Sequence, residues 1–254
     1  MKFTKKLSLV FCLFLLSFLP LQRKKIKIWL IGDSTCANKE IKAYPETGWG
    51  MPFKYFFDST VEVDNRAMNG RSTKSFIAEN RWQPVVDNLQ EGDYVFIQFG
   101  HNDEGKEKVG RYTTPDEFKS NLTRYVNETR SKKGVPVLIT PVARRTFDSV
   151  TAQITESHPV YSDVVRTVAK QNNVALIDLD AKSMALLQQL GPENSKLLYN
   201  HLVSGEHPNY PDGKKDDTHF NELGARRMAE IVLAEIRNLK LGLAERMVKP
   251  VLKK

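Results

Sequence analysis

Five short apolar segments along the chain have the pattern of buried β-strands. Each is rich in Val, Ile, Leu or Phe and is bounded by turn-forming residues such as Gly and Asn. Strands are therefore predicted over residues 25–31, 61–66, 94–99, 135–139 and 174–179.

Apolar residues at helical spacing fill the stretches between and after these strands. One helix is predicted to begin directly after Thr114, which is a capping residue followed by Pro115 in the first turn and two acids. The remaining helices are predicted over residues 160–170, 181–190 and about 221–241. We interpret the apolar stripe of each helix as core packing.

Strands that alternate with helices predict an α/β fold with a parallel sheet covered on both faces. Ligands in such sheets bind beyond the carboxyl ends of the strands, so the residues that follow each strand are the first candidates for function. The polar segment 200–217 is expected to be a long loop, and such loops are often functional. No linker rich in Pro, Gly or Ser divides the chain after residue 22, which predicts a single domain over 22–254.

The N-terminus has the pattern of a secretory signal peptide. Lys2, Lys5 and Lys6 precede an uncharged apolar run over residues 7–19. This run is shorter than the roughly 20 residues of a transmembrane helix. We therefore predict a signal peptide over residues 1–21, export to the periplasm or medium, and no stable membrane insertion after cleavage.

Composition and charge narrow the classes further. With 254 residues, of which 41% are hydrophobic, the chain can bury a large core. Its cysteines, Cys12 and Cys36, are too few for a disulfide scaffold. The predicted signal peptide carries three lysines and no acid, so its removal lowers the formal net charge from +8 to +5. This balance suits an anionic polymer, but no nucleic-acid motif is present and no nucleic-acid partner is expected.

Polar residues with catalytic potential follow the predicted strands. Ser34 follows the first, Gly70 the second and Asn102 the third, while Asp216 and His219 precede the last helix. Each has an ordinary interpretation as a cap or a turn residue. Together they supply a nucleophile, two oxyanion donors and an Asp–His pair, the groups needed for acyl transfer through a serine ester.

These blocks, in this order, resemble the SGNH (GDSL-type) hydrolase superfamily. The flanking sequences are similar to its rhamnogalacturonan acetylesterase branch, which removes acetyl groups from pectin and related plant polysaccharides. The segments that carry the resemblance are GDST at 32–35, PETGWG at 45–50, NGRSTKSF at 69–76, QFGHND at 98–103 and DTHFN at 217–221.

The resemblance implies a three-layer, flavodoxin-like α/β/α fold and no metal or organic cofactor. It also implies that Ser34 attacks the acetyl carbonyl, that His219 is the base, and that Asp216 orients His219. Asp217 is the alternative to Asp216. The implied oxyanion hole consists of the Ser34 and Gly70 backbone N–H groups and the Asn102 side chain. An acetylated polysaccharide or oligosaccharide is the implied partner; the oligomeric state is left open.

Substrate contacts are predicted from position. Trp49 is a candidate for stacking on a sugar ring, and burial is the alternative. Arg71, Arg144 and Arg145 follow strand ends, where an arginine would suit a galacturonate carboxylate; the alternative for each is a solvated surface residue.

Several other functions stay open. An acetyl xylan esterase, a lipase or a thioesterase of the same superfamily is compatible with the motifs, as is a glycan-binding protein without activity. A metal-dependent hydrolase is a further alternative, because potential ligands lie close together in sequence, although no established metal-binding spacing is present. They are His201, Glu206, His207, Asp212, Asp216, Asp217 and His219.

Overall fold

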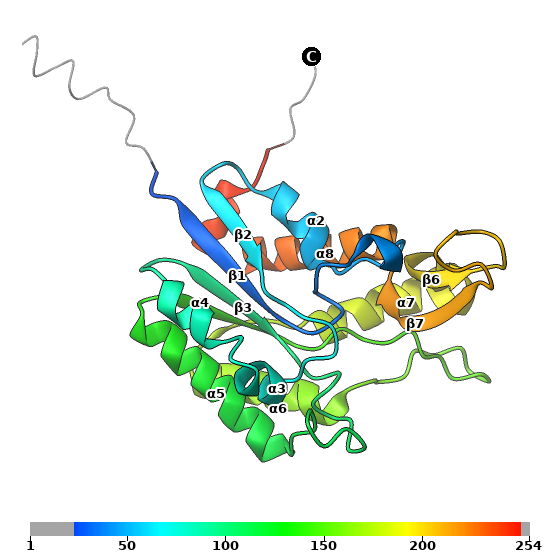
Figure 1. Cartoon of the computed structure of the whole chain (residues 1–254), viewed down its shortest axis with the longest axis horizontal. Helices are drawn as coiled ribbons and strands as arrows, with labels where there is room; N and C mark the ends of the chain where they lie inside the picture. Colours follow the sequence, from blue (N-terminus) through cyan, green and yellow to red (C-terminus); the bar gives the residue numbers. More distant parts are fainter. Residues whose placement is uncertain (1–22, 250–254) are drawn as a thin grey trace, which may run out of the picture.

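A computed structural model describes residues 23–249, so the predicted signal peptide lies outside the described residues. The centre of the fold is the predicted five-stranded parallel sheet, and its strands lie in the order β2-β1-β3-β4-β5 (Figure 1). The strands are β1 (Ile26–Gly32), β2 (Val61–Asn65), β3 (Tyr94–Gln98), β4 (Val135–Ile139) and β5 (Ala175–Ile177).

Helices cover both faces of this sheet and complete the predicted three-layer α/β fold (Figure 1). One face is covered by α2 (Gly50–Phe53), α7 (Leu179–Asn194) and α8 (Glu222–Asn238). The other is covered by α3 (Thr73–Ala78), α4 (Gln83–Asn88), α5 (Pro115–Ser131) and α6 (Pro159–Gln171). Short 3₁₀ helices lie at η1 (Ile41–Ala43), η2 (Lys54–Phe56), η3 (Ser195–Leu198) and η4 (Gly242–Arg246).

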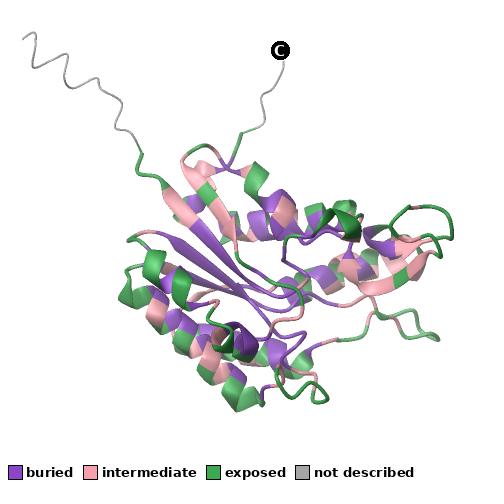
Figure 2. Ribbon diagram, viewed as in Figure 1, coloured by how far each residue is buried: buried purple, intermediate pink, exposed green. Residues whose placement is uncertain are grey.

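Side chains on each central strand divide between two hydrophobic cores. In β1, Leu30 packs in the core under α8, while Trp29 and Ile31 pack in the core under α5 and α6. Successive residues of a strand point to opposite faces of the sheet, which explains this division. Figure 2 shows the resulting buried sheet between helices whose outer faces are exposed.

The boundaries of two predicted elements follow from side-chain caps. Helix α5 begins at Pro115 as predicted, because Thr114 and Glu117 form a reciprocal capping box. The fifth strand is shorter than predicted and ends at Ile177, because the Asp178 side chain accepts a hydrogen bond from the Ala181 N–H and caps α7.

The expected polar loop over residues 200–217 is partly wrong. Strand β6 (Tyr199–Leu202) pairs antiparallel with β7 (Lys214–Phe220), and only the segment between them is a loop. The sequence of β7, KKDDTHF, lacks the apolar alternation by which a strand is recognised. Because β7 is a strand, Asp216 and His219 lie on a strand and not in a loop.

None of the helices described for residues 23–249 is long and apolar enough to cross a membrane.

Candidate active site

The predicted catalytic groups come from separate elements. Ser34 follows β1, Gly70 follows β2 and Asn102 follows β3, so all three lie beyond the carboxyl ends of neighbouring strands. Asp216 and His219 come from β7, outside the central sheet. Parallel strands bring their carboxyl ends to one edge, which explains how distant sequence blocks meet there.

Ser34, His219 and Asp216 form a hydrogen-bonded series. The Ser34 Oγ lies 2.9 Å from His219 Nε2, and His219 Nδ1 lies 2.9 Å from Asp216 Oδ2. This arrangement gives the serine hydroxyl a base and gives the base a carboxylate to orient it.

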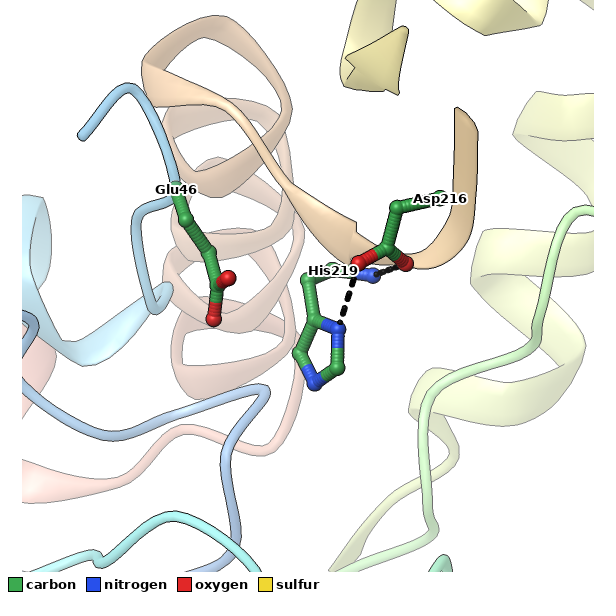
Figure 3. A group of neighbouring side chains, drawn as sticks. All are labelled: Glu46, Asp216 and His219. Carbon is green, nitrogen blue, oxygen red and sulfur yellow. Dashed lines mark hydrogen bonds and ion pairs between the residues drawn. The ribbon is translucent and has the colours of Figure 1, made fainter. Parts of the chain in front are cut away.

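The Asp216 carboxylate is held in its charged form. Burial alone would raise the pKa of Asp216, but the His219 side chain and the backbone N–H groups of Thr218 and His219 hold this pKa well below its usual range. Both N–H groups donate to Asp216 Oδ1 at 2.9 Å, which leaves Oδ2 for the imidazole. Figure 3 shows Asp216 on one side of the His219 ring.

Asp217, the alternative partner of His219, faces different residues. Its Oδ1 accepts a hydrogen bond from Arg145 Nε and lies 2.7 Å from His201 Nε2. Adjacent residues of a strand point to opposite sides, so Asp216 and Asp217 serve different contacts. The geometry therefore pairs His219 with Asp216.

Three N–H donors are the candidates for the predicted oxyanion hole. Within residues 23–249, the backbone N–H groups of Ser34 and Gly70 donate to no protein acceptor. The Asn102 Nδ2 donates to the Arg71 carbonyl oxygen at 3.1 Å, which uses one of its two N–H bonds and leaves the other. Gly70 has a φ of 74°, a conformation that side chains disfavour.

Trp49 lies in the core and forms part of the support for the serine turn. Its indole is fully buried and donates to Gln98 Oε1 at 2.6 Å, and Gln98 donates to Thr35 Oγ1 at 2.8 Å. Thr35 in turn donates to Asp33 Oδ1. No face of the indole is free for a sugar, so the prediction of stacking is wrong and the alternative of burial holds.

Each of the three arginines proposed for substrate pairs with a carboxylate of the protein. Their ion-pair partners are Glu79 for Arg71, Glu104 for Arg144 and Asp217 for Arg145. These pairs occupy guanidinium groups that were expected to face the substrate.

Arg111 was missed by the sequence reasoning, because it lies in an irregular polar segment far from any predicted strand end. A Cβ added to Gly70 would lie only 3.0 Å from Arg111 Nη1, which places this guanidinium beside the candidate oxyanion site. In the described part of the chain, Arg111 forms no ion pair with a carboxylate, unlike Arg71, Arg144 and Arg145. It is therefore a partly exposed positive charge next to Gly70.

One group of side chains has a geometry that a metal could use. Oxygen or nitrogen atoms of Glu46, Asp216 and His219 lie within 4.8 Å of one another (Figure 3). The ammonium groups of Lys39 and Lys214 already lie 2.8 and 3.2 Å from the Glu46 carboxylate, and Lys214 lies 3.5 Å from Asp216. Two positive charges at these oxygens repel a cation, so the donor set fits a metal poorly.

Two clefts are lined by residues that neighbour Glu46 or Asp216 in the sequence. One, of about 630 Å³, is lined by Pro45 and Thr47, the neighbours of Glu46, and by the exposed Tyr55. The other, of about 420 Å³, is lined by Arg145 and Asp217 among others.

Comparison with known proteins identifies the family of the chain. Residues 30–227 match the GDSL-like Lipase/Acylhydrolase family. The chain is 40% identical to rhamnogalacturonan acetylesterase RhgT of Bacillus subtilis over 90% of this chain and 97% of that protein. It is 31% identical to a rhamnogalacturonan acetylesterase of Emericella nidulans over 82% of this chain and 84% of that protein.

A solved acetylxylan esterase from Geobacillus stearothermophilus shares the fold, with a TM-score of 0.57 at 16% identity, over 85% of this chain and 96% of that one. The chain belongs to the GDSL-like lipase/acylhydrolase family.

Proposed function

We propose that this protein is a serine esterase that removes O-acetyl groups from a plant cell-wall polysaccharide, with rhamnogalacturonan as the substrate. The observation that carries the proposal is the unbroken series from Ser34 Oγ through His219 to Asp216, with 2.9 Å at each step. The two relatives named as rhamnogalacturonan acetylesterases support the choice of substrate.

The first half of the reaction forms an acetyl-enzyme. Ser34 Oγ attacks the acetyl carbonyl carbon while its proton passes to His219 Nε2. The negative oxygen of the tetrahedral intermediate accepts hydrogen bonds from the N–H groups of Ser34 and Gly70 and from Asn102. The bond to the sugar oxygen then breaks, and this oxygen takes the proton from His219.

The second half releases acetate. Water attacks the carbonyl carbon of acetyl-Ser34 and gives its proton to His219. The second tetrahedral intermediate uses the same three donors. It collapses as the bond between the carbonyl carbon and Ser34 Oγ breaks, acetate leaves, and Ser34 Oγ takes the proton back from His219. Throughout, the ionised Asp216 stabilises the imidazolium form of His219.

Arg111 supports an anionic polysaccharide as the substrate. Its guanidinium lies beside Gly70. In the proposed reaction, the sugars adjoining the one that carries the acetyl group would pass close to this position. A guanidinium binds a carboxylate through two parallel hydrogen bonds, which suits the galacturonate of rhamnogalacturonan. The clefts next to Glu46 and Asp217 offer room for further sugars of a polymer.

Export is part of the same proposal, because a plant cell-wall polysaccharide lies outside the cell that would degrade it. The basic start and the apolar run over residues 7–19 support cleavage of a signal peptide near residue 21. The mass of the protein recovered from the culture medium or periplasm would test this; retention of residues 1–21 there would contradict it.

The activity is tested with residues 22–254 and a Ser34→Ala variant. We expect the wild type to release acetate from acetylated rhamnogalacturonan and to cleave p-nitrophenyl acetate in preference to the octanoate, while Ser34→Ala does neither. Faster release from acetylated xylan would favour the xylan esterase, and preference for octanoate would favour the lipase. Full activity in Ser34→Ala would refute the serine mechanism.

A further inference from the structure

A buried lysine lies directly beneath the nucleophile. The Lys39 side chain is only 1% exposed. Its Nζ lies 2.6 Å from the Ser34 carbonyl oxygen, 2.8 Å from Asn69 Oδ1 and 2.8 Å from Glu46 Oε1. An ammonium group has three N–H donors, and each here has one acceptor. The orientation of the Lys39 ammonium is therefore fully determined.

The three acceptors of Lys39 belong to segments that meet at the reacting centre. Ser34 provides the nucleophile, and Asn69 immediately precedes Gly70. Lys39 thus connects the loop after β1 with the loop after β2, and these loops carry the two backbone N–H donors of the oxyanion site. A displacement of about 1 Å at such a site can cost about 100-fold in rate.

Glu46 extends these contacts back to the triad. Its Oε1 binds Lys39, and its Oε2 lies 3.2 Å from the Lys214 ammonium, which lies 3.5 Å from Asp216 Oδ2. Because Asp216 binds His219 and His219 binds Ser34, the contacts return to the residue from which they began. We call this closed series of Lys39, Glu46, Lys214, Asp216, His219 and Ser34 the charged ring. Two positive and two negative charges alternate along its first four members.

We propose that the charged ring positions the catalytic groups, and that Lys39 and Glu46 are positioning residues for the esterase reaction. Neither residue touches the acetyl group. Lys39 sets the spacing of the Ser34 and Gly70 donors, and Glu46 keeps the buried ammonium paired while it links the serine side of the site to Asp216. The inference rests on the proposed function, because it assigns these residues a role in that reaction.

The alternation of charge explains why the complete ring is stable and why loss of one charged member is costly. A buried charge is costly unless it is paired and hydrogen-bonded. Loss of Glu46 alone leaves the buried Lys39 ammonium with no carboxylate partner, and loss of Lys39 alone leaves Glu46 with Lys214 as its cation. Loss of both removes the buried ammonium together with its carboxylate. Loss of Lys39 and loss of Glu46 should therefore be strongly non-additive.

The test compares Lys39→Met, Glu46→Gln and the double variant with the wild type and with Ser34→Ala, with p-nitrophenyl acetate as substrate. Titration with a serine-directed phosphonate counts the functional sites, so kcat per site is unaffected by loss of folded protein. We expect Lys39→Met to lower kcat per site by about 100-fold with KM within threefold, since the ring acts on orientation and not on binding. We expect the double variant to lose less than the product of the two single losses.

Lys42→Met is the matched control. Lys42 belongs to the same segment and pairs with Glu40 at 2.8 Å, but its side chain is 84% exposed. Its kcat should stay within twofold of the wild type.

Three outcomes separate the possibilities. If the wild type is active, Ser34→Ala is inactive and Lys39→Met keeps kcat within threefold, the positioning role is refuted and the serine mechanism stands. If Ser34→Ala remains active, the proposed function itself fails. If Lys39→Met does not fold, Glu46→Gln decides: a tenfold or greater loss of kcat per site supports the ring, and an unchanged kcat overturns it.

Discussion

His219 Nε2 lies 2.9 Å from Ser34 Oγ, although 185 positions separate the two residues in the chain. The serine follows the first strand of the central sheet, and the histidine lies on the second strand of the β6–β7 hairpin. The reacting centre is therefore assembled only when the hairpin is held against the carboxyl end of the sheet. Any substitution that moves the hairpin should reduce activity even where the sheet is intact.

The two adjacent aspartates on β7 should differ sharply in their effect on activity. Asp216→Asn removes the negative charge that orients and stabilises His219, and kcat should fall by about 10³–10⁴-fold. Asp217→Asn changes only the contacts with Arg145 and His201, so kcat should stay within about threefold. Steady-state kinetics with p-nitrophenyl acetate measures both, and equal losses would refute the assignment of Asp216.

Asn102 should contribute to the rate and not to substrate binding. Asn102→Ala removes one of three donors to the oxyanion, and kcat should fall by about 10²–10³-fold with little change in KM. Because Asn102 also donates to the Arg71 carbonyl oxygen, the melting temperature is measured alongside. Asn88→Ala, on the exposed end of α4, serves as the control. A rise in KM at constant kcat would contradict the assignment.

Arg111 should distinguish charged from neutral substrates. Arg111→Ala is expected to raise KM for acetylated rhamnogalacturonan by about tenfold, because a charge-assisted contact with a carboxylate is lost. Its kinetics with p-nitrophenyl acetate should not change. Arg124→Ala, which removes a guanidinium paired with Glu128 on α5, controls for total charge. Equal effects on both esters would mean that Arg111 does not bind the carboxylate.

Asp103 should make the protein less stable as the pH rises. This carboxyl is buried beneath the site, where it accepts hydrogen bonds from Thr73 and Thr113; burial outweighs them and raises the pKa of Asp103 to about 7. The folded state therefore retains a proton that the unfolded chain releases. The stabilising contribution is complete below the unfolded pKa of about 4 and is lost as the pH rises through 7.

Thermal unfolding between pH 4.5 and 8 checks this prediction. The melting temperature of Asp103→Asn should decline less over this range than that of the wild type. Asp212→Asn, at an exposed position, should follow the wild type. Parallel curves for all three proteins would exclude Asp103 as the source of the dependence.

Removal of metal ions should leave the activity intact. The only group within residues 23–249 that could hold an ion is Glu46, Asp216 and His219, and its carboxylates are already paired with Lys39 and Lys214. We expect acetate release to be unchanged after dialysis against a chelator. A loss that added zinc or calcium restores would reopen the metal-dependent alternative.

Much of this protein can be read directly from its local sequence. Short segments rich in β-branched residues predict all five strands of the sheet. The signal is strongest in β1, β3 and β4, which are mostly buried on both faces. The Thr114 cap marks the start of α5 within one residue. The motif blocks around Ser34, Gly70, Asn102 and His219 predict the chemistry, since this chemistry requires those residue types.

The tertiary structure decided what depends on long-range contacts. Strand β7 is polar apart from Phe220, and the loop predicted over residues 200–217 includes its first half. Its strand character comes from pairing with β6 and not from its own composition. The orientation of β7 assigned His219 to Asp216 and left Asp217 to Arg145. Trp49 proved to be a buried support and Arg111 a neighbour of Gly70. The sequence alone determined the elements and the type of chemistry. The packing of distant segments determined which side chains meet, because burial and charge pairing are properties of the folded chain.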